Sequence, residues 1–236
     1  MPGGAPPRVL PLNDNVSLIV ADVPASVYAG GAIEARLSDL DWVSRCGTAH
    51  HAVADEIVQM HTVIPFRLFT LFSSDAKAVA TLGRRAKTMD KALERVAGKT
   101  EWVLKISKPA KGEVSPKLAE DSARAKADTS TGTSFLQKKA AAKHAAAEAA
   151  KRVLEDAART YETLAAMASE STLRQVDSGA GLLLDASFLV PSRKVAAFKR
   201  TLSQAADGLL EAGCRVSFTG PWPPYSFVAL EGGARG

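Results

Sequence analysis

The sequence predicts an α+β protein built from two domains. Three observations support this. Short β-rich runs alternate with helical apolar spacing over residues 8–107, an alanine-rich helical pattern covers residues 135–169, and a strand–helix–strand pattern follows it. The 236 residues exceed the usual size of one domain, and a hydrophobic content of 46% is ordinary for a globular protein with a core.

Residues 1–107 are expected to form the first domain, a small sheet covered by helices on one face. The expected elements are a strand at 16–23, a helix at 37–62, an apolar strand-like run at 64–72, a helix at 77–96 and a strand at 101–107. Pro24 ends the first strand, and Gly98 is a plausible stop for the second helix.

Residues 108–133 are expected to form a polar linker or mobile loop, because prolines and glycine interrupt all periodicity there. Residues 134–236 form the second, smaller domain. It opens with a long helix at 135–169, in which thirteen of the residues from Gln137 to Ser169 are alanine, the strongest helix former. Small residues recur there every three or four positions and predict a narrow, coiled-coil-like packing seam: Ala146, Ala150, Val153, Ala157, Tyr161, Leu164 and Ala168. A strand at 182–190, a helix at 192–212 and a strand at 214–219 follow.

The positive charge of the chain is local. Residues 105–152 hold eleven Lys/Arg and five Asp/Glu, an excess of six, whereas the whole chain carries +5. This segment lacks the interleaved aromatic residues that stack on bases, so a solvated helix face is favoured and no nucleic acid is expected as a partner. The alternative is a nucleic-acid or anionic-surface binding protein that acts through residues 105–152.

No catalytic, cofactor or metal site is predicted. Gly98-Lys99-Thr100 lacks the upstream glycine of a phosphate-binding loop, since Leu93 stands there. His50 and His51 point about 100° apart on a helix, which disfavours zinc and favours plain helix surface. Asp185 on a predicted strand is expected to be half buried and paired, with a structural role.

Neither a membrane span nor a secretory signal is predicted, so a cytoplasmic protein is expected. Cys46 and Cys214 lie far apart in the sequence and belong to no metal-binding motif. They are expected to be two buried free thiols.

Residues 219–228, Thr-Gly-Pro-Trp-Pro-Pro-Tyr-Ser-Phe-Val, form the most unusual segment of the chain, here called the proline corner. Three prolines fix their φ angles and remove three backbone donors, so Trp222 and Tyr225 stand on a stiffened segment. A turn that closes the core is the favoured interpretation, and a binding surface is the alternative.

The proline corner closely resembles the signature that ends the last strand of gas vesicle proteins of the GvpL/GvpF family. Three further blocks resemble the family in the same order: His50-His51-x-Val53 with Val63-Ile64-Pro65-Phe66-Arg67 and Thr70-Leu71-Phe72, then Gly98-Lys99-x-Glu101-Trp102-Val103-Leu104-Lys105, then Gly132-Thr133-Ser134-Phe135-Leu136-x-Lys138-Lys139. The chain departs from the family pattern at Leu68-Phe69, where Phe-Gly is customary, and at its start, which leaves open whether the first strand is present.

The resemblance implies that the N-terminal domain is a variant of the ferredoxin-like fold. It also implies a non-catalytic accessory protein of gas vesicle assembly in the cytoplasm, in contact with the hydrophobic shell protein or other accessory proteins and located on the gas-facing side of the shell. The oligomeric state stays open, and a monomer is compatible with the sequence. The residues expected to form the interaction surface or structural corner are Trp222, Pro223, Pro224, Tyr225, Pro65, Phe66 and Arg67. For Arg67, pairing with a buried carboxylate or a backbone carbonyl is favoured over surface recognition.

Overall fold

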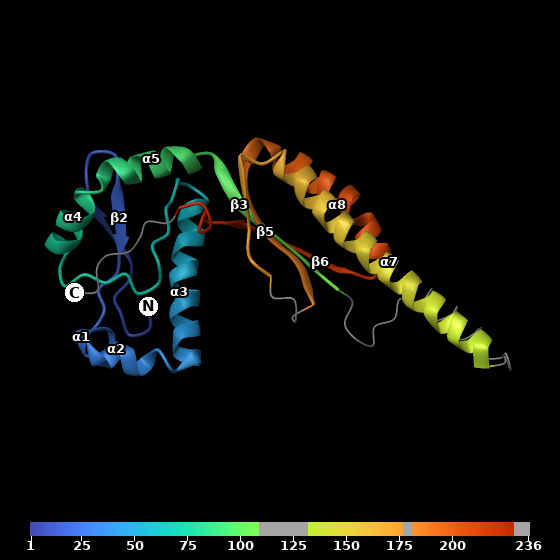
Figure 1. Ribbon diagram of the computed structural model, residues 1–236. Helices are drawn as coiled ribbons and strands as arrows, with labels where there is room; N and C mark the ends of the chain where they lie inside the picture. Colours follow the sequence, from blue (N-terminus) through green and yellow to red (C-terminus); the bar gives the residue numbers. More distant parts are fainter. Residues whose placement is uncertain (109–131, 177–180, 229–236) are drawn as a thin grey trace. The chain divides into compact units, whose positions relative to one another are not determined.

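The computed structural model describes residues 1–108, 132–176 and 181–228, and it is a mixed α+β structure (Figure 1). The predicted fold class is therefore confirmed. The contacts divide the chain into two units. The first unit comprises Met1–Gly98 together with Trp222–Gly236, and the second comprises Lys99–Pro221. The predicted linker, residues 108–133, lies almost entirely outside the described residues.

The second unit is built on a four-stranded sheet with the order β4-β5-β3-β6. Its elements are β3 (Lys99–Ser107), α7 (Gly132–Ala165), β4 (Glu170–Leu173), β5 (Leu182–Pro191), a 3-10 turn (Ser192–Lys194), α8 (Val195–Glu211) and β6 (Arg215–Trp222), which ends at the first residue of the other unit. This β-α-β-β-α-β order is the ferredoxin-like arrangement. It was expected in residues 1–107, but the structure has it from Lys99 onward.

The reason for the difference is the pairing of β3. This strand pairs along its length with β5 in antiparallel register, Trp102 opposite Phe188 and Lys105 opposite Asp185, so it belongs to the sheet of the second unit. Strand pairing over this sequence distance leaves no local signal in residues 101–107. The boundary expected at residue 107 therefore lies at residue 98 in the structure.

Helices α7 and α8 lie side by side on one face of this sheet (Figure 1). The hydroxyl of Thr160 in α7 donates a hydrogen bond to the carbonyl of Ala205 in α8, at 3.1 Å. The buried side chains between the helices and the sheet include Trp102, Leu104, Ile106, Ala157, Leu164, Phe188, Val190, Phe198, Leu202, Leu209 and Cys214.

Only the second half of α7 uses the predicted seam. Ala157 and Leu164 are buried, and Val153 and Tyr161 pack against the core. Ala146 and Ala150 are exposed, as are all residues from 137 to 152. The high helix propensity of alanine stabilises this exposed part of the helix.

Gly220 marks a close approach between β6 and β3, which are neighbours in the sheet. Its φ angle is 141°, and a Cβ atom at this position would lie 2.8 Å from the carbonyl oxygen of Glu101. Glycine is required because any larger residue would collide with backbone there. The proline corner thus leaves the sheet from a position fixed by backbone contact.

The first unit contains one hairpin and five helices in its described part. The elements are β1 (Arg8–Pro11), β2 (Ser17–Val20), α1 (Ala25–Tyr28), α2 (Gly31–Arg36), α3 (Leu40–Val58), α4 (Asp75–Gly83) and α5 (Ala86–Val96). β1 and β2 pair antiparallel, and the Asn13 side chain accepts hydrogen bonds from the backbone N–H groups of Asn15 and Val16 in the turn. The first strand, which the sequence left open, is present as β1.

Two expectations for this unit are wrong. Residues 64–72 form no strand, and the helix expected at 77–96 is two helices that break after Gly83. Pro65 offers no backbone donor to a sheet, and Phe69 has a positive φ angle of 64°, which a strand does not allow. Glycine is a poor helix former, which accounts for the end of α4.

Among the described residues, two hydrophobic clusters stabilise the first unit. One gathers Leu18, Leu82 and Met89 between the hairpin, α4 and α5, and Ile64, Phe66 and Phe72 pack on it. The other contains Tyr28, Trp42 and Cys46, with Leu68 and Phe69 packed against it. Burial, with a lesser contribution from Cys46 at 3.7 Å, raises the pKa of the Tyr28 phenol to about 12. Both cysteines are buried and free, as expected.

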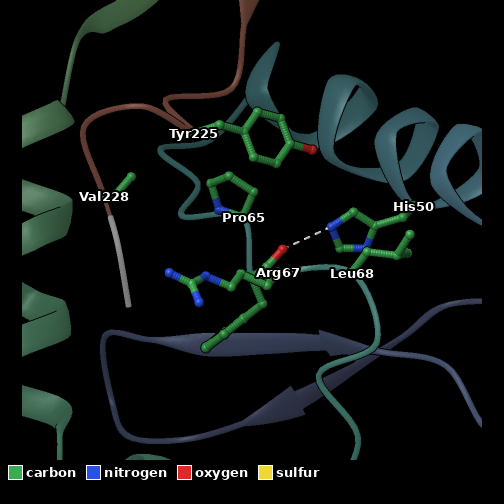
Figure 2. A pocket seen from close by; sticks show the side chains of 7 residues that line it. His50, Pro65, Arg67, Leu68, Tyr225 and Val228 are labelled. Atoms are coloured by element: carbon green, nitrogen blue, oxygen red, sulfur yellow. Dashed lines mark hydrogen bonds between the residues drawn. The ribbon is translucent and has the colours of Figure 1, made fainter. Parts of the chain in front are cut away.

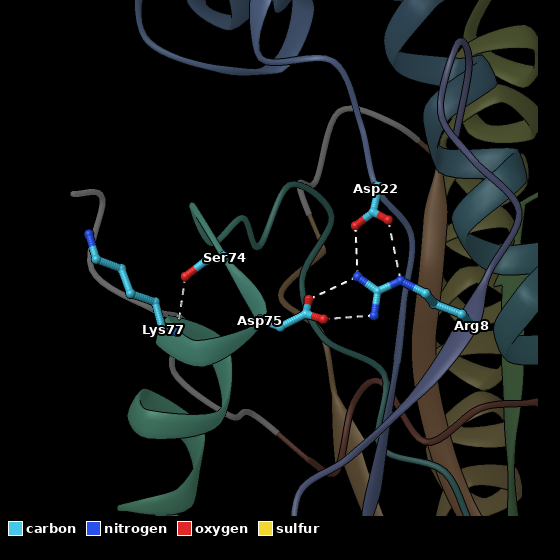
Figure 3. Close-up of polar contacts among 5 residues, drawn as sticks. All are labelled: Arg8, Asp22, Ser74, Asp75 and Lys77. Carbon is cyan, nitrogen blue, oxygen red and sulfur yellow. Dashed lines mark hydrogen bonds and ion pairs between the residues drawn. The ribbon is translucent and has the colours of Figure 1, made fainter.

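Arg8 of β1 joins three segments of the first unit through two carboxylates (Figure 3). Its guanidinium binds Asp22, with Nη2 2.8 Å from Oδ1, and Asp75, with both Nη atoms 2.9 Å from the carboxylate. Asp75 is the first residue of α4, and the hydroxyl of Ser74 accepts the backbone N–H of Lys77 as the N-cap. Hydrogen bonding to Arg8 lowers the pKa of Asp75 below its usual 3.8.

We predict that Asp75→Asn lowers stability near neutral pH but not in acid. A carboxyl whose pKa is lowered by folding stabilises the folded state above its unfolded pKa, and this contribution disappears as the pH falls through the lowered value. The difference in Tm between the wild type and Asp75→Asn should therefore shrink from about pH 4 to about pH 2. Asp14→Asn, which removes an exposed carboxyl with no ion pair among the described residues, is the matched control. A difference that does not change with pH would contradict the role of Asp75.

Phe69 combines an unfavourable backbone with a favourable ring contact. Its ring stacks on Trp42, with centroids 5.4 Å apart and an interplanar angle of 4°. Its φ of 64° falls in the left-handed region, which costs a residue with a Cβ atom about 1–2 kcal/mol. The backbone therefore keeps the glycine-like conformation at the position where the resembling family has glycine.

We predict that Phe69→Ala destabilises the protein by about 2 kcal/mol, because the ring contact is lost and the strain is kept. Phe69→Gly should be about 1 kcal/mol more stable than Phe69→Ala, because it also relieves the strain. Urea unfolding followed by tryptophan fluorescence measures both. Equal stability of the two variants would show that the backbone at residue 69 is not strained.

Candidate functional site

The candidate site lies in the first unit, where residues 222–228 of the proline corner return to it. Pro223 and Pro224 are almost fully buried, whereas Tyr225 is 39% exposed. The N–H of Tyr225 donates to the carbonyl of Pro223 at 2.7 Å, and the N–H of Phe227 donates to Pro224 at 3.2 Å. Buried prolines and these short turns hold the Tyr225 ring at the surface.

His51 of helix α3 packs against the aromatic side chains of Trp222 and Tyr225. The ring centroid of His51 lies 4.9 Å from that of Trp222 and 6.3 Å from that of Tyr225. Asp39 caps this helix by accepting the N–H of Trp42 at 3.0 Å, which fixes where it begins. The imidazole of His51 is therefore a packing surface for both rings.

The extended segment 64–68 forms the second wall of the site. Ile64 and Phe66 contact the hairpin cluster, and the four consecutive residues from Pro65 to Leu68 all line the pocket. His50 Nε2 lies 3.0 Å from the carbonyl oxygen of Phe66, and the ring nitrogen is the donor because a carbonyl only accepts. This bond fixes to α3 a segment that lies in no sheet.

Together these elements enclose a pocket of about 290 Å³ (Figure 2). Its lining residues are His50, Pro65, Phe66, Arg67, Leu68, Tyr225 and Val228. The lining is mostly apolar, and Arg67 is its exposed cation. The arrangement suits the recognition of an apolar group next to a negative charge.

The structure brings together four of the seven residues that the sequence proposed: Pro65, Phe66, Arg67 and Tyr225 line one pocket. Trp222 does not line it but contacts His51 behind Tyr225, and Pro223 and Pro224 are buried supports. The pairing predicted for Arg67 is wrong. Instead of pairing in the interior, it is exposed and forms no ion pair with any of the described residues.

Sequence reasoning missed His50, His51, Leu68 and Val228. The two histidines were assigned to plain helix surface, yet both are half buried and hold the two walls of the site. A signal was available, because His50 and His51 belong to the same family-like block as residues 63–72.

No group of three or more His, Cys, Asp or Glu side chains among the described residues could hold a metal ion. Asp185, expected to be half buried and paired, is buried and lies 3.7 Å from both Lys105 and Arg174, while its Oδ1 accepts no hydrogen bond from the described residues. None of the described helices is long and apolar enough to span a bilayer.

Comparisons with known proteins agree on one family. The model of the family described as gas vesicle synthesis protein GvpL/GvpF matches residues 2–229. The chain is 29% identical over 235 residues to gas vesicle protein L from Streptomyces sp. (strain CB03234), covering 97% of this chain and 85% of that protein.

Two crystal structures of the gas vesicle protein GvpF have a similar fold. The protein from Anabaena sp. PCC7120 matches with a TM-score of 0.63 and 13% identity, over 94% of this chain and 87% of its own. The protein from Microcystis aeruginosa matches with a TM-score of 0.57 and 11% identity, over 94% and 88%. Since the family model spans nearly the whole sequence and the resemblance found in the motifs points the same way, this chain belongs to the GvpL/GvpF family of gas vesicle proteins.

Proposed function

We propose that the protein is a non-catalytic accessory factor of gas vesicle assembly that binds the hydrophobic shell protein or other accessory proteins. The binding surface is the pocket between the proline corner and residues 64–68, with Tyr225 as its exposed aromatic residue. The observation that supports this most is the rigid presentation of that ring. Buried prolines lie on its N-terminal side, and His51 packs against it.

The physical advantage of this arrangement is preorganisation. A side chain held in its binding conformation loses little conformational entropy when a partner docks, so more of the contact energy appears as affinity. Aromatic residues dominate the energetics of protein interfaces, above all where rigid neighbours surround them. A shell subunit with an apolar face needs such a binder, because exposed apolar patches aggregate in water.

The polar groups of the pocket support binding over turnover. The described polar lining consists of His50, Arg67 and Tyr225. Among the described residues, the pocket lining contains no serine, threonine or cysteine that the imidazole of His50 could activate as a nucleophile. We propose that the protein acts in the cytoplasm at the growing vesicle and lies on the gas-facing side of the shell.

We predict that Trp222→Ala/Tyr225→Ala weakens capture of the shell protein at least about tenfold, since two aromatic anchors are removed. A pull-down of shell protein by the tagged full-length chain measures this, with circular dichroism to verify that each variant is folded. Tyr225→Ala alone, at an exposed position, separates loss of the ring from loss of packing at Trp222.

Leu210→Ala is the matched control, because this exposed leucine lies on α8 outside the pocket. It should leave the yield unchanged. Equal yields from the wild type and the folded double variant would remove the proline corner from the interface.

The alternative function, nucleic-acid or anionic-surface binding through residues 105–152, keeps one supporting observation. Lys138, Lys139, Lys143, Lys151 and Arg152 all lie on the exposed part of α7. Salt distinguishes the two functions. Binding through phosphates collapses between low and moderate salt, whereas hydrophobic association persists or strengthens.

A further inference from the structure

The pocket between Tyr225 and residues 65–68 is large enough to receive an apolar side chain of a partner. Its volume of about 290 Å³ lies just below the range for small-molecule sites, roughly 300–1,000 Å³. A nucleotide or a cofactor would not be enclosed there. Pro65, Phe66, Leu68 and Val228 give it an apolar lining, which suits a leucine, isoleucine, valine or phenylalanine.

The charge of the pocket comes from Arg67. This residue is exposed, and among the described residues no carboxylate lies within ion-pair distance of it. His50, the other basic group of the lining, is already bonded to the carbonyl of Phe66. Figure 2 shows the guanidinium of Arg67 directed away from His50, below Pro65 and towards the side of Val228.

We propose that the pocket recognises a two-part motif on the partner protein: an apolar side chain that enters it, and an Asp or Glu next to that side chain that binds Arg67. This inference rests on the proposed docking function and names the chemistry of the partner. A guanidinium binds a carboxylate through two parallel N–H donors, so Arg67 fixes the direction of the bound segment as well as its charge.

The apolar and charged parts contribute differently. Burying an aliphatic side chain supplies most of the affinity, and an exposed ion pair adds only a little. The carboxylate therefore acts mainly on specificity, by favouring an acidic neighbour over a neutral or basic one. An apolar lining alone would bind many apolar segments. Arg67 restricts binding to segments with an acidic residue beside the apolar side chain.

The test uses the full-length protein and three blocked synthetic peptides that differ only at the central pair: Leu-Asp, Leu-Asn and Ala-Asp. Binding is followed by NMR shift changes of the Tyr225 and Val228 signals. The wild type should bind Leu-Asp about threefold tighter than Leu-Asn. It should bind Leu-Asp about tenfold tighter than Ala-Asp. Arg67→Gln should abolish the preference for Asp over Asn and keep the preference for Leu over Ala.

Arg45→Gln is the matched control, because it makes the same charge change on the exposed side of α3. Arg45→Gln should leave both preferences intact. Arg67→Lys should keep part of the preference for Asp over Asn. Since Arg67 is exposed, these variants are expected to fold, and thermal unfolding verifies it.

Three outcomes would overturn the inference: no binding of any peptide by the wild type, equal binding of Leu-Asp and Leu-Asn, or a preference for Asp that survives Arg67→Gln. Tighter peptide binding after removal of residues 229–236 would identify the chain's own Leu230-Glu231 pair as a competing occupant of the pocket, and would also contradict the inference. These results are separable from the proposed function. If Tyr225→Ala still abolishes capture of the shell protein, docking at the pocket stands even when the acidic preference fails.

Discussion

The packing of His51 against Trp222 and Tyr225 is the contact on which the candidate site depends. It joins the middle of α3 to a segment some 170 residues later in the chain, and through it the end of the sequence completes the first unit. Without this contact, Tyr225 and Val228 would not line a pocket with residues 65–68. The buried Pro223 and Pro224 stiffen the backbone between these two rings.

Residues 64–72 form an irregular segment that supplies part of the pocket lining. Residues 64–72 have no strand partner, yet they are held on both sides by the two hydrophobic clusters and by the His50–Phe66 hydrogen bond. Arg67 stands exposed on this segment. Rigid elements thus position a loop-like surface, which is the usual way in which folds present binding residues.

The sequence predicted what local periodicity controls. The α+β class, the long alanine-rich helix and the helix before the last strand all agree with the structure because amphipathic spacing is a local signal. β4 was missed and β1 was left open, whereas β2, which is equally short, was predicted because it lies within the β-rich run at 16–23. The membership of β3 in the second sheet and the return of the corner to α3 depend on contacts between distant residues. His50 and His51 were misjudged for the same reason, because their partners lie elsewhere in the chain.

The nuclear Overhauser effect between the ring protons of His51 and the indole protons of Trp222 tests this account most directly. The centroid separation of 4.9 Å predicts clear cross-peaks between these rings, with weaker ones from His51 to Tyr225 at 6.3 Å. Their presence in the folded full-length chain would establish that the proline corner is part of the first unit. If a well-dispersed spectrum showed no cross-peak from His51 to either ring, the corner would lie elsewhere and the pocket would not exist as described.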